Sequence, residues 1–133
     1  MSPECAENVS RTPRTSITVA LALAVLGASV LNPRWIGASG ADAVLGLTAW
    51  FHLVGYAALG AALRPRFRPG WQGAAVAVAL ATGYGAGIEC LQSALAFRTA
   101  SLVDAAINGT GALLGVAVRD GVERRRGAGR TRR

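Results

Sequence analysis

Apolar residues fall into four long runs, which short polar segments separate. The runs extend over about residues 17–31, 43–63, 71–97 and 102–118, and each holds at most one Asp, Glu, Arg or His. About 20 mostly apolar residues let a helix cross the hydrocarbon core of a bilayer, which is roughly 30 Å thick. The pattern therefore predicts an all-α integral membrane bundle of four transmembrane helices with short loops. The fourth run is short and crosses only if it stands nearly upright or is flanked by snorkelling residues.

Two segments flank this transmembrane domain, which we assign to residues 17–118. Residues 1–16 combine prolines with charged residues and lack a helical apolar period, which predicts a disordered N-terminal tail. Residues 119–133 form an arginine-rich C-terminal tail. The first run also fits a secretory signal peptide cleaved near residues 41–43, and the orientation of the other three helices is the same in both interpretations.

The chain is 52% hydrophobic and has a net charge of +7, and the placement of its charges predicts an orientation in the membrane. All fourteen basic residues are arginines, and twelve lie before the first run, between the second and third runs, or after the fourth. The positive-inside rule then puts both termini on the cytoplasmic side of the cytoplasmic (plasma) membrane. No aromatic residue interleaves the tail arginines, so we expect contact with anionic lipid there and no nucleic acid partner.

Polar side chains recur at helical spacing inside the last three runs. An ionisable group within an apolar span costs about 2.5–3.5 kcal/mol for Asp or Arg, so such residues hold a bundle together or carry function. With the orientation above, they form a funnel that opens outward, deepest at His52 and Glu89 and shallowest at Arg98. The expected ligand-binding residues are His52, Tyr56, Glu89, Gln92, Arg98, Ser101, Asp104 and Asn108.

His52 and Glu89 are the candidate catalytic residues, because a carboxyl group and an imidazole facing each other make an acid and base couple. Arg98 suits a phosphate or carboxylate near the outer surface. The chain has no nucleophile elbow, no glycine-rich phosphate loop and only one histidine, so we expect neither cofactor nor metal. Cys5 and Cys90 are too far apart in the predicted topology to pair.

Structural interpretations of the same residues stay open. Arg98 and Asp104 can form a salt bridge that locks the outer turn, while Gln92 and Asn108 can form hydrogen bonds between helices. His52 can be a packing residue.

Glycines spaced four residues apart occur at Gly83 and Gly87 and again at Gly111 and Gly115. Such pairs favour close helix packing in lipid, either within one chain or in a homo-oligomer.

Taken together, residues 42–118 resemble the VanZ-like family of integral membrane proteins, named for a protein that gives resistance to the glycopeptide antibiotic teicoplanin. Thr48 and Ala49 occupy the positions where that family often has an Asp-Lys pair. The family pattern appears here as His52 and Tyr56, Glu89 and Gln92, Arg98, Ser101, Asp104 and Asn108, and Gly111 and Gly115.

The resemblance implies a role in the cell envelope. We expect the polar funnel to bind an envelope lipid or a glycopeptide-like head group. Two other functions are compatible with the same residues: an intramembrane hydrolase or transferase that acts on a lipid-linked head group, and a structural subunit of a membrane complex.

Overall fold

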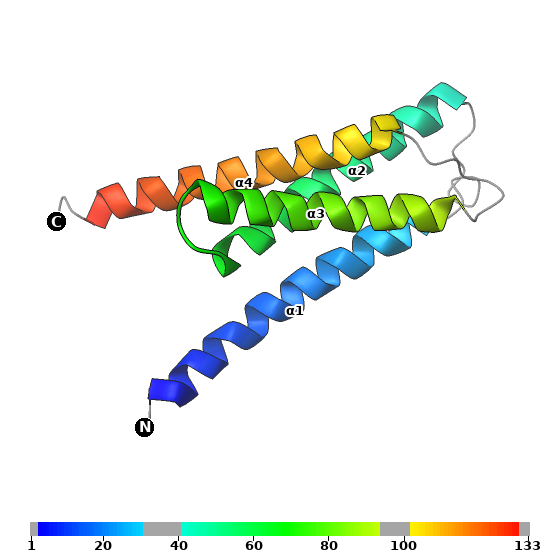
Figure 1. The fold of residues 1–133 in the computed structure, drawn as a ribbon. Coiled ribbons are helices and arrows are strands. Elements are labelled where there is room, and N and C mark those ends of the chain that lie inside the picture. The colour runs from blue at the N-terminus through cyan, green and yellow to red at the C-terminus, as the bar shows by residue number, and fades with distance from the viewer. Residues whose placement is uncertain (1–2, 31–40, 94–101, 131–133) are drawn as a thin grey trace.

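The computed structural model describes residues 3–30, 41–93 and 102–130, and its long elements are four helices (Figure 1). No strand occurs among these residues, which confirms the all-α prediction. The elements are α1 (Pro3–Val30), α2 (Ala41–Leu63), the short 3₁₀ helix η2 (Arg64–Arg66), α3 (Trp71–Gln92) and α4 (Leu102–Arg130).

Three helices are long and apolar enough to cross a membrane, over Gly46–Arg66, Trp71–Gln92 and Leu102–Gly129. The chain is therefore a membrane protein. The apolar part of α1, Thr15–Val30, is shorter. At 1.5 Å per residue it extends about 24 Å, less than the roughly 30 Å core, so the predicted fourth span does not follow from length.

The helix ends differ from those expected from the apolar runs. α1 starts at Pro3 and continues through the segment expected to be a disordered tail, and a proline is tolerated at the first helical position. The described part of α3 extends to Gln92, and the expected end near residue 97 lies outside the described residues. α4 continues through Arg130 instead of ending near residue 118, because a polar helix needs no apolar period and gains from contacts such as that between Arg119 and Glu123.

Many large apolar side chains lie on the outside of the bundle, and several polar side chains are buried inside it together with small apolar ones. Trp50 is 66% exposed and Leu113 is 58% exposed, although both lie within candidate spans. The buried polar side chains are Ser29, His52, Arg64, Glu89, Gln92 and Asn108. A soluble protein would expose these groups to water, whereas in a bilayer the same arrangement keeps them away from hydrocarbon.

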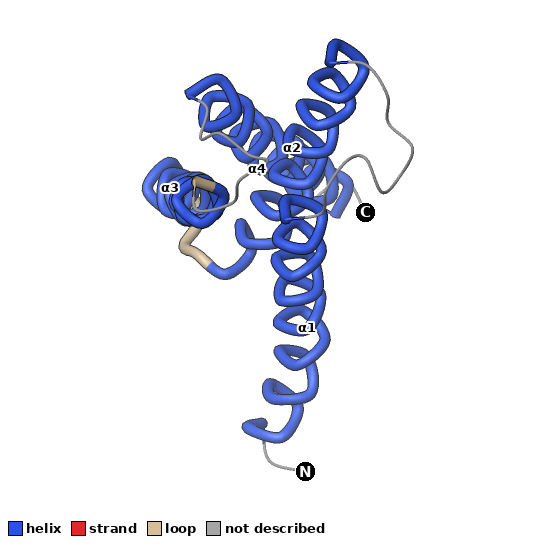
Figure 2. The backbone as a smooth tube through the Cα atoms, turned by 90° about the vertical axis from the view of Figure 1, so that its right-hand side faces the viewer, coloured by secondary structure: helices blue, strands red, loops and turns tan. Residues whose placement is uncertain are grey.

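Helices α2 and α4 lie side by side through glycines (Figure 2). A Cβ at Gly60 would lie 2.6 Å from the carbonyl oxygen of Ala112, and one at Gly111 would lie 2.5 Å from that of Leu53. Gly115 faces the Ala57 carbonyl even more closely. These contacts let the two backbones approach closely and confirm the packing role expected of the pair on α4.

The glycine pair on α3 has a different outcome. A Cβ at Gly83 or Gly87 would meet nothing within 4 Å, so neither residue supports a contact within the described chain.

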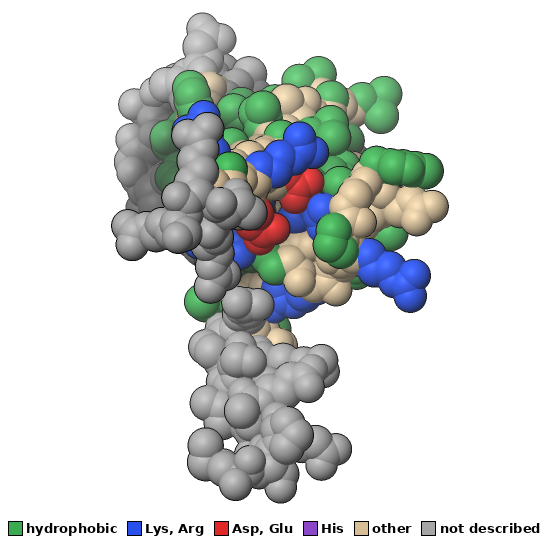
Figure 3. All heavy atoms as spheres, turned by 90° about the vertical axis from the view of Figure 1, so that its left-hand side faces the viewer, with side chains coloured by type: hydrophobic (Ala, Val, Ile, Leu, Met, Phe, Trp, Pro, Cys, Tyr) green, Lys and Arg blue, Asp and Glu red, His purple; other side chains and the backbone are tan. Residues whose placement is uncertain are grey.

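Arg64 joins the turn after α2 to α4. Its side chain is only 6% exposed, and its Nε lies 2.7 Å from Asp120 Oδ1. The same guanidinium donates to the carbonyl of Arg68 at 3.1 Å and to that of Gly70 at 3.3 Å. Gly70 has a φ of 99°, a conformation that side chains disfavour. Figure 3 looks onto this end of the bundle, where arginines surround carboxylates.

Replacing Gly115 by alanine should destabilise the bundle by about 1–3 kcal/mol, because the added methyl group collides with the Ala57 carbonyl of α2. Gly83→Ala is the matched control. Its methyl group meets nothing within 4 Å, and alanine improves helix propensity by up to about 1 kcal/mol. Unfolding by SDS titration in mixed micelles measures both variants. Equal stability of the two would contradict the close approach of α2 and α4.

Candidate functional site

A hydrogen bond between His52 of α2 and Asn108 of α4 lies at the centre of the site. The distance from His52 Nδ1 to Asn108 Oδ1 is 2.8 Å, and His52 is 5% exposed and Asn108 1% exposed. Because an amide oxygen only accepts, the ring nitrogen donates. The Tyr56 ring lies beside this pair, with its centroid 6.0 Å from that of His52. Tyr56 is fully buried.

The third wall of the site comes from α3, where Gly85 leaves room for the pair. A Cβ at Gly85 would lie 2.8 Å from Asn108 Nδ2 and 3.1 Å from the Tyr56 ring. One turn further along α3, Glu89 is 7% exposed and close enough to Tyr56 to act on it electrostatically. Side chains of three helices therefore meet at one level of the bundle.

Two hydrogen bonds attach α1 to α3. Gln92 Nε2 donates to the Ser29 carbonyl at 2.7 Å, and Tyr84 Oη donates to the Ala22 carbonyl at 2.7 Å. Both acceptors are main-chain groups of α1, so the role visible for Gln92 is to hold a neighbouring helix. This agrees with the structural interpretation of that residue.

Two polar atoms at the centre of the site have no hydrogen-bond partner among the described residues. They are Tyr56 Oη and Asn108 Nδ2. Leaving a buried donor unsatisfied costs about 1–3 kcal/mol, and such groups are uncommon in folded proteins. Asn108 Nδ2 and the Tyr56 ring both lie next to Gly85 of α3. Together they offer unused hydrogen-bonding capacity inside the bundle.

Five of the eight expected site residues are buried, and a sixth, Asp104, is half-buried in the first turn of α4. Arg98 and Ser101 lie outside the described residues. The five buried ones are His52, Tyr56, Glu89, Gln92 and Asn108.

The hydrogen bond found for His52 is to an amide, and the acid and base couple with Glu89 stays a prediction. Among the residues that the structure describes, no cluster of three or more His, Cys, Asp or Glu side chains could hold a metal ion.

Comparison of the chain with protein-family models, with curated proteins and with solved structures finds no match. The site offers an imidazole, a carboxyl group, a phenol and the carboxamide of Asn108 to a ligand that carries hydrogen-bonding groups.

A double-mutant cycle tests the central contact. His52→Ala and Asn108→Ala should each lower the free energy of unfolding, and together they should show a coupling of about 0.6 kcal/mol, with an upper value near 1.7 kcal/mol. SDS titration in mixed micelles provides the four free energies.

Thr110 of α4 supplies the control cycle, since its hydroxyl donates within its own helix to the Ala106 carbonyl at 2.8 Å. The effects of Thr110→Ala and His52→Ala should simply add. Additivity in the His52 and Asn108 cycle as well would contradict a direct bond.

Proposed function

We propose that this chain is a VanZ-like membrane protein of the cell envelope that binds a polar head group in the site around His52 and Asn108. The ligand is an envelope lipid or a glycopeptide-like group. One observation carries the proposal: Tyr56 Oη and Asn108 Nδ2 converge inside the bundle without partners among the described residues. A ligand that accepts from the amide and the phenol would recover the free energy that these two groups cost the empty protein.

The burial pattern agrees with a site made of the residues that carry the resemblance. Seven of the residues that carry the resemblance are buried at helix contacts: His52, Tyr56, Glu89, Gln92, Asn108, Gly111 and Gly115. Burial of these residues is expected if the pattern encodes a shared site inside the bundle. If these residues had been scattered over the surface, their positions would not have agreed with a shared site.

The proposal includes four membrane crossings, with both termini in the cytoplasm. α1 contacts α3 at Tyr84 through Ala22 and at Gln92 through Ser29, so the two helices run in the same direction. The start of α1 and the end of α4 lie at the same end of the bundle (Figure 1). Arginines precede the apolar part of α1, and long basic side chains can reach the interface from a short span.

An acid and base enzyme is the second candidate, and the His52 hydrogen bond favours it. Donation from Nδ1 to Asn108 leaves Nε2 as the nitrogen that carries the lone pair, which is the arrangement of a general base. Glu89 provides a carboxyl group on the adjacent helix. A head-group hydrolase or transferase would use these two groups, with Arg98, which lies outside the described residues, as the expected anion contact.

Tyr56→Phe separates binding from packing. The substitution removes an unpartnered hydroxyl and keeps the ring, so the free energy of unfolding should stay the same or rise. If the site binds a ligand, the variant should fail to restore growth of a deletion strain under an envelope-directed antibiotic, although a blot shows normal membrane levels.

Tyr84→Phe is the matched control, because it removes a hydroxyl whose bond to Ala22 is structural. It should lower stability and keep function wherever the protein still accumulates. Full complementation by Tyr56→Phe would contradict a binding role for the site. Loss of function in Glu89→Gln alone, with Tyr56→Phe active, would favour the enzyme.

A further inference from the structure

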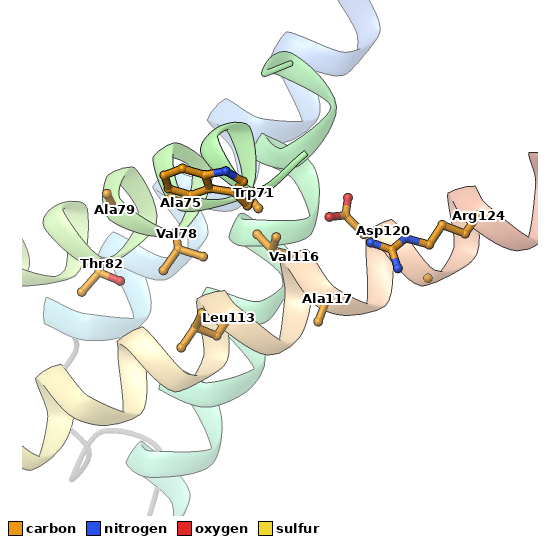
Figure 4. A pocket seen from close by; sticks show the side chains of 12 residues that line it. Trp71, Ala75, Val78, Ala79, Thr82, Leu113, Val116, Ala117, Asp120 and Arg124 are labelled. Carbon is orange, nitrogen blue, oxygen red and sulfur yellow. The ribbon is translucent and has the colours of Figure 1, made fainter. Parts of the chain in front are cut away.

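A groove runs between α3 and α4, away from the polar site. Its volume is about 840 Å³, within the range of roughly 300–1,000 Å³ that is usual for ligand pockets. Figure 4 shows Val78, Ala79 and Thr82 on one side and Leu113, Val116 and Ala117 on the other. Small side chains leave the groove open, and its lining is almost entirely apolar along this part.

At its other end the groove meets charged residues. Trp71, Asp120 and Arg124 line both this groove and a neighbouring pocket of about 550 Å³ at the end of the bundle. The charged residues of that pocket are Arg64, Arg119, Arg124, Asp120 and Glu123. The groove and the pocket therefore form a continuous surface that is apolar in the span and charged at the helix ends.

One positive charge in this pocket is not compensated. Arg64 pairs with Asp120 at 2.7 Å, and Arg119 pairs with Glu123 at 2.8 Å. Arg124 has no ion-pair partner within the described part of the chain, although its side chain extends back along α4 toward Asp120 (Figure 4). The pocket thus presents a net positive charge to a ligand.

The length of the groove matches one leaflet of a bilayer. From Trp71 to Thr82 along α3, and likewise from Leu113 to Arg124 along α4, the rise is about 16 Å. Half of a hydrocarbon core of roughly 30 Å is about 15 Å. Trp71 is 78% exposed at the end where an aromatic side chain suits the membrane interface.

We propose that this groove is a binding site for one anionic phospholipid of the arginine-rich side of the membrane. An acyl chain lies between α3 and α4, and the phosphate lies against Arg124 beside Trp71. Charge and length together specify this occupant: a chain one leaflet long that carries a negative group at its interfacial end. The site is independent of the polar site around His52.

A second copy of the chain fits this surface less well. In a twofold dimer the same patch lies on both sides of the interface, so Arg124 of one copy would approach Arg124 of the other. Such a contact brings like charges together, whereas a phosphate neutralises the arginine.

Quenching of Trp71 fluorescence by brominated lipid tests the proposal. A variant with Trp35→Phe and Trp50→Phe leaves Trp71 as the only tryptophan. It is reconstituted in phosphatidylcholine nanodiscs that contain a small fraction of either brominated phosphatidylglycerol or brominated phosphatidylcholine. We expect about five-fold stronger relative binding of the anionic lipid, which is the preference that one basic residue near the surface provides.

Arg124→Gln in this background should abolish the preference, and Arg125→Gln is the matched control. Both arginines are exposed on α4, but only Arg124 lines the groove. A second pair of variants tests the space in the groove. Ala79 lines the groove, so Ala79→Phe should fill it, whereas Ala86 is exposed on α3 outside the groove and Ala86→Phe is the control. We expect Ala79→Phe to reduce quenching by the anionic lipid and Ala86→Phe to leave it unchanged.

Three outcomes would overturn the proposal. Equal quenching by the two brominated lipids means that only ordinary boundary lipid contacts Trp71. An equal loss of preference in Arg124→Gln and Arg125→Gln means that the whole basic surface attracts lipid without a site. If both brominated lipids quench Trp71 less in nanodiscs that hold two copies of the chain than in nanodiscs that hold one, a second chain covers the groove.

Discussion

The close approach of α2 and α4 is the constraint on which the other contacts depend. Gly60, Gly111 and Gly115 remove the side chains that would hold the two backbones apart. Only at that separation can the short side chain of Asn108 reach the His52 ring across the interface. Lipid tails are as apolar as leucine, so apolar contact alone would not hold these helices together, and van der Waals contact between backbones has to provide the attraction.

The polar groups then divide into two classes. Some are used to hold helices, as when Gln92 donates to a carbonyl of α1 or Arg64 joins the turn before α3 to α4. Others, Tyr56 Oη and Asn108 Nδ2, are buried without a partner among the described residues. The first class explains why polar residues are retained in an apolar span. The second is not needed for packing, and it is the basis of the proposed binding site.

Much of this arrangement could be predicted from the sequence, because a helix has a fixed period and a bilayer has a fixed thickness. The buried face with His52, Glu89 and Asn108 follows from that period. The partner of each group does not follow, since the period gives a direction on one helix but no distance to another. The sequence showed two equivalent glycine pairs, and only the neighbouring helix determines that Gly111 is in contact while Gly83 is not. The apolar runs also did not predict that α4 continues to Arg130, because hydropathy indicates which residues contact lipid and does not indicate where a helix ends.

Arg64 has a consequence for biosynthesis. The chain is made from its N-terminus, so Arg64 leaves the ribosome long before Asp120, its partner in the finished protein. During that interval the charge of Arg64 has no carboxylate on α4 to pair with, and it adds to the charges of Arg66 and Arg68 in the same segment. Once α4 is inserted, the same charge is compensated and buried. The order of translation therefore separates an early period, in which Arg64 is a charge without its carboxylate, from the finished protein, in which the same side chain clamps the turn to α4.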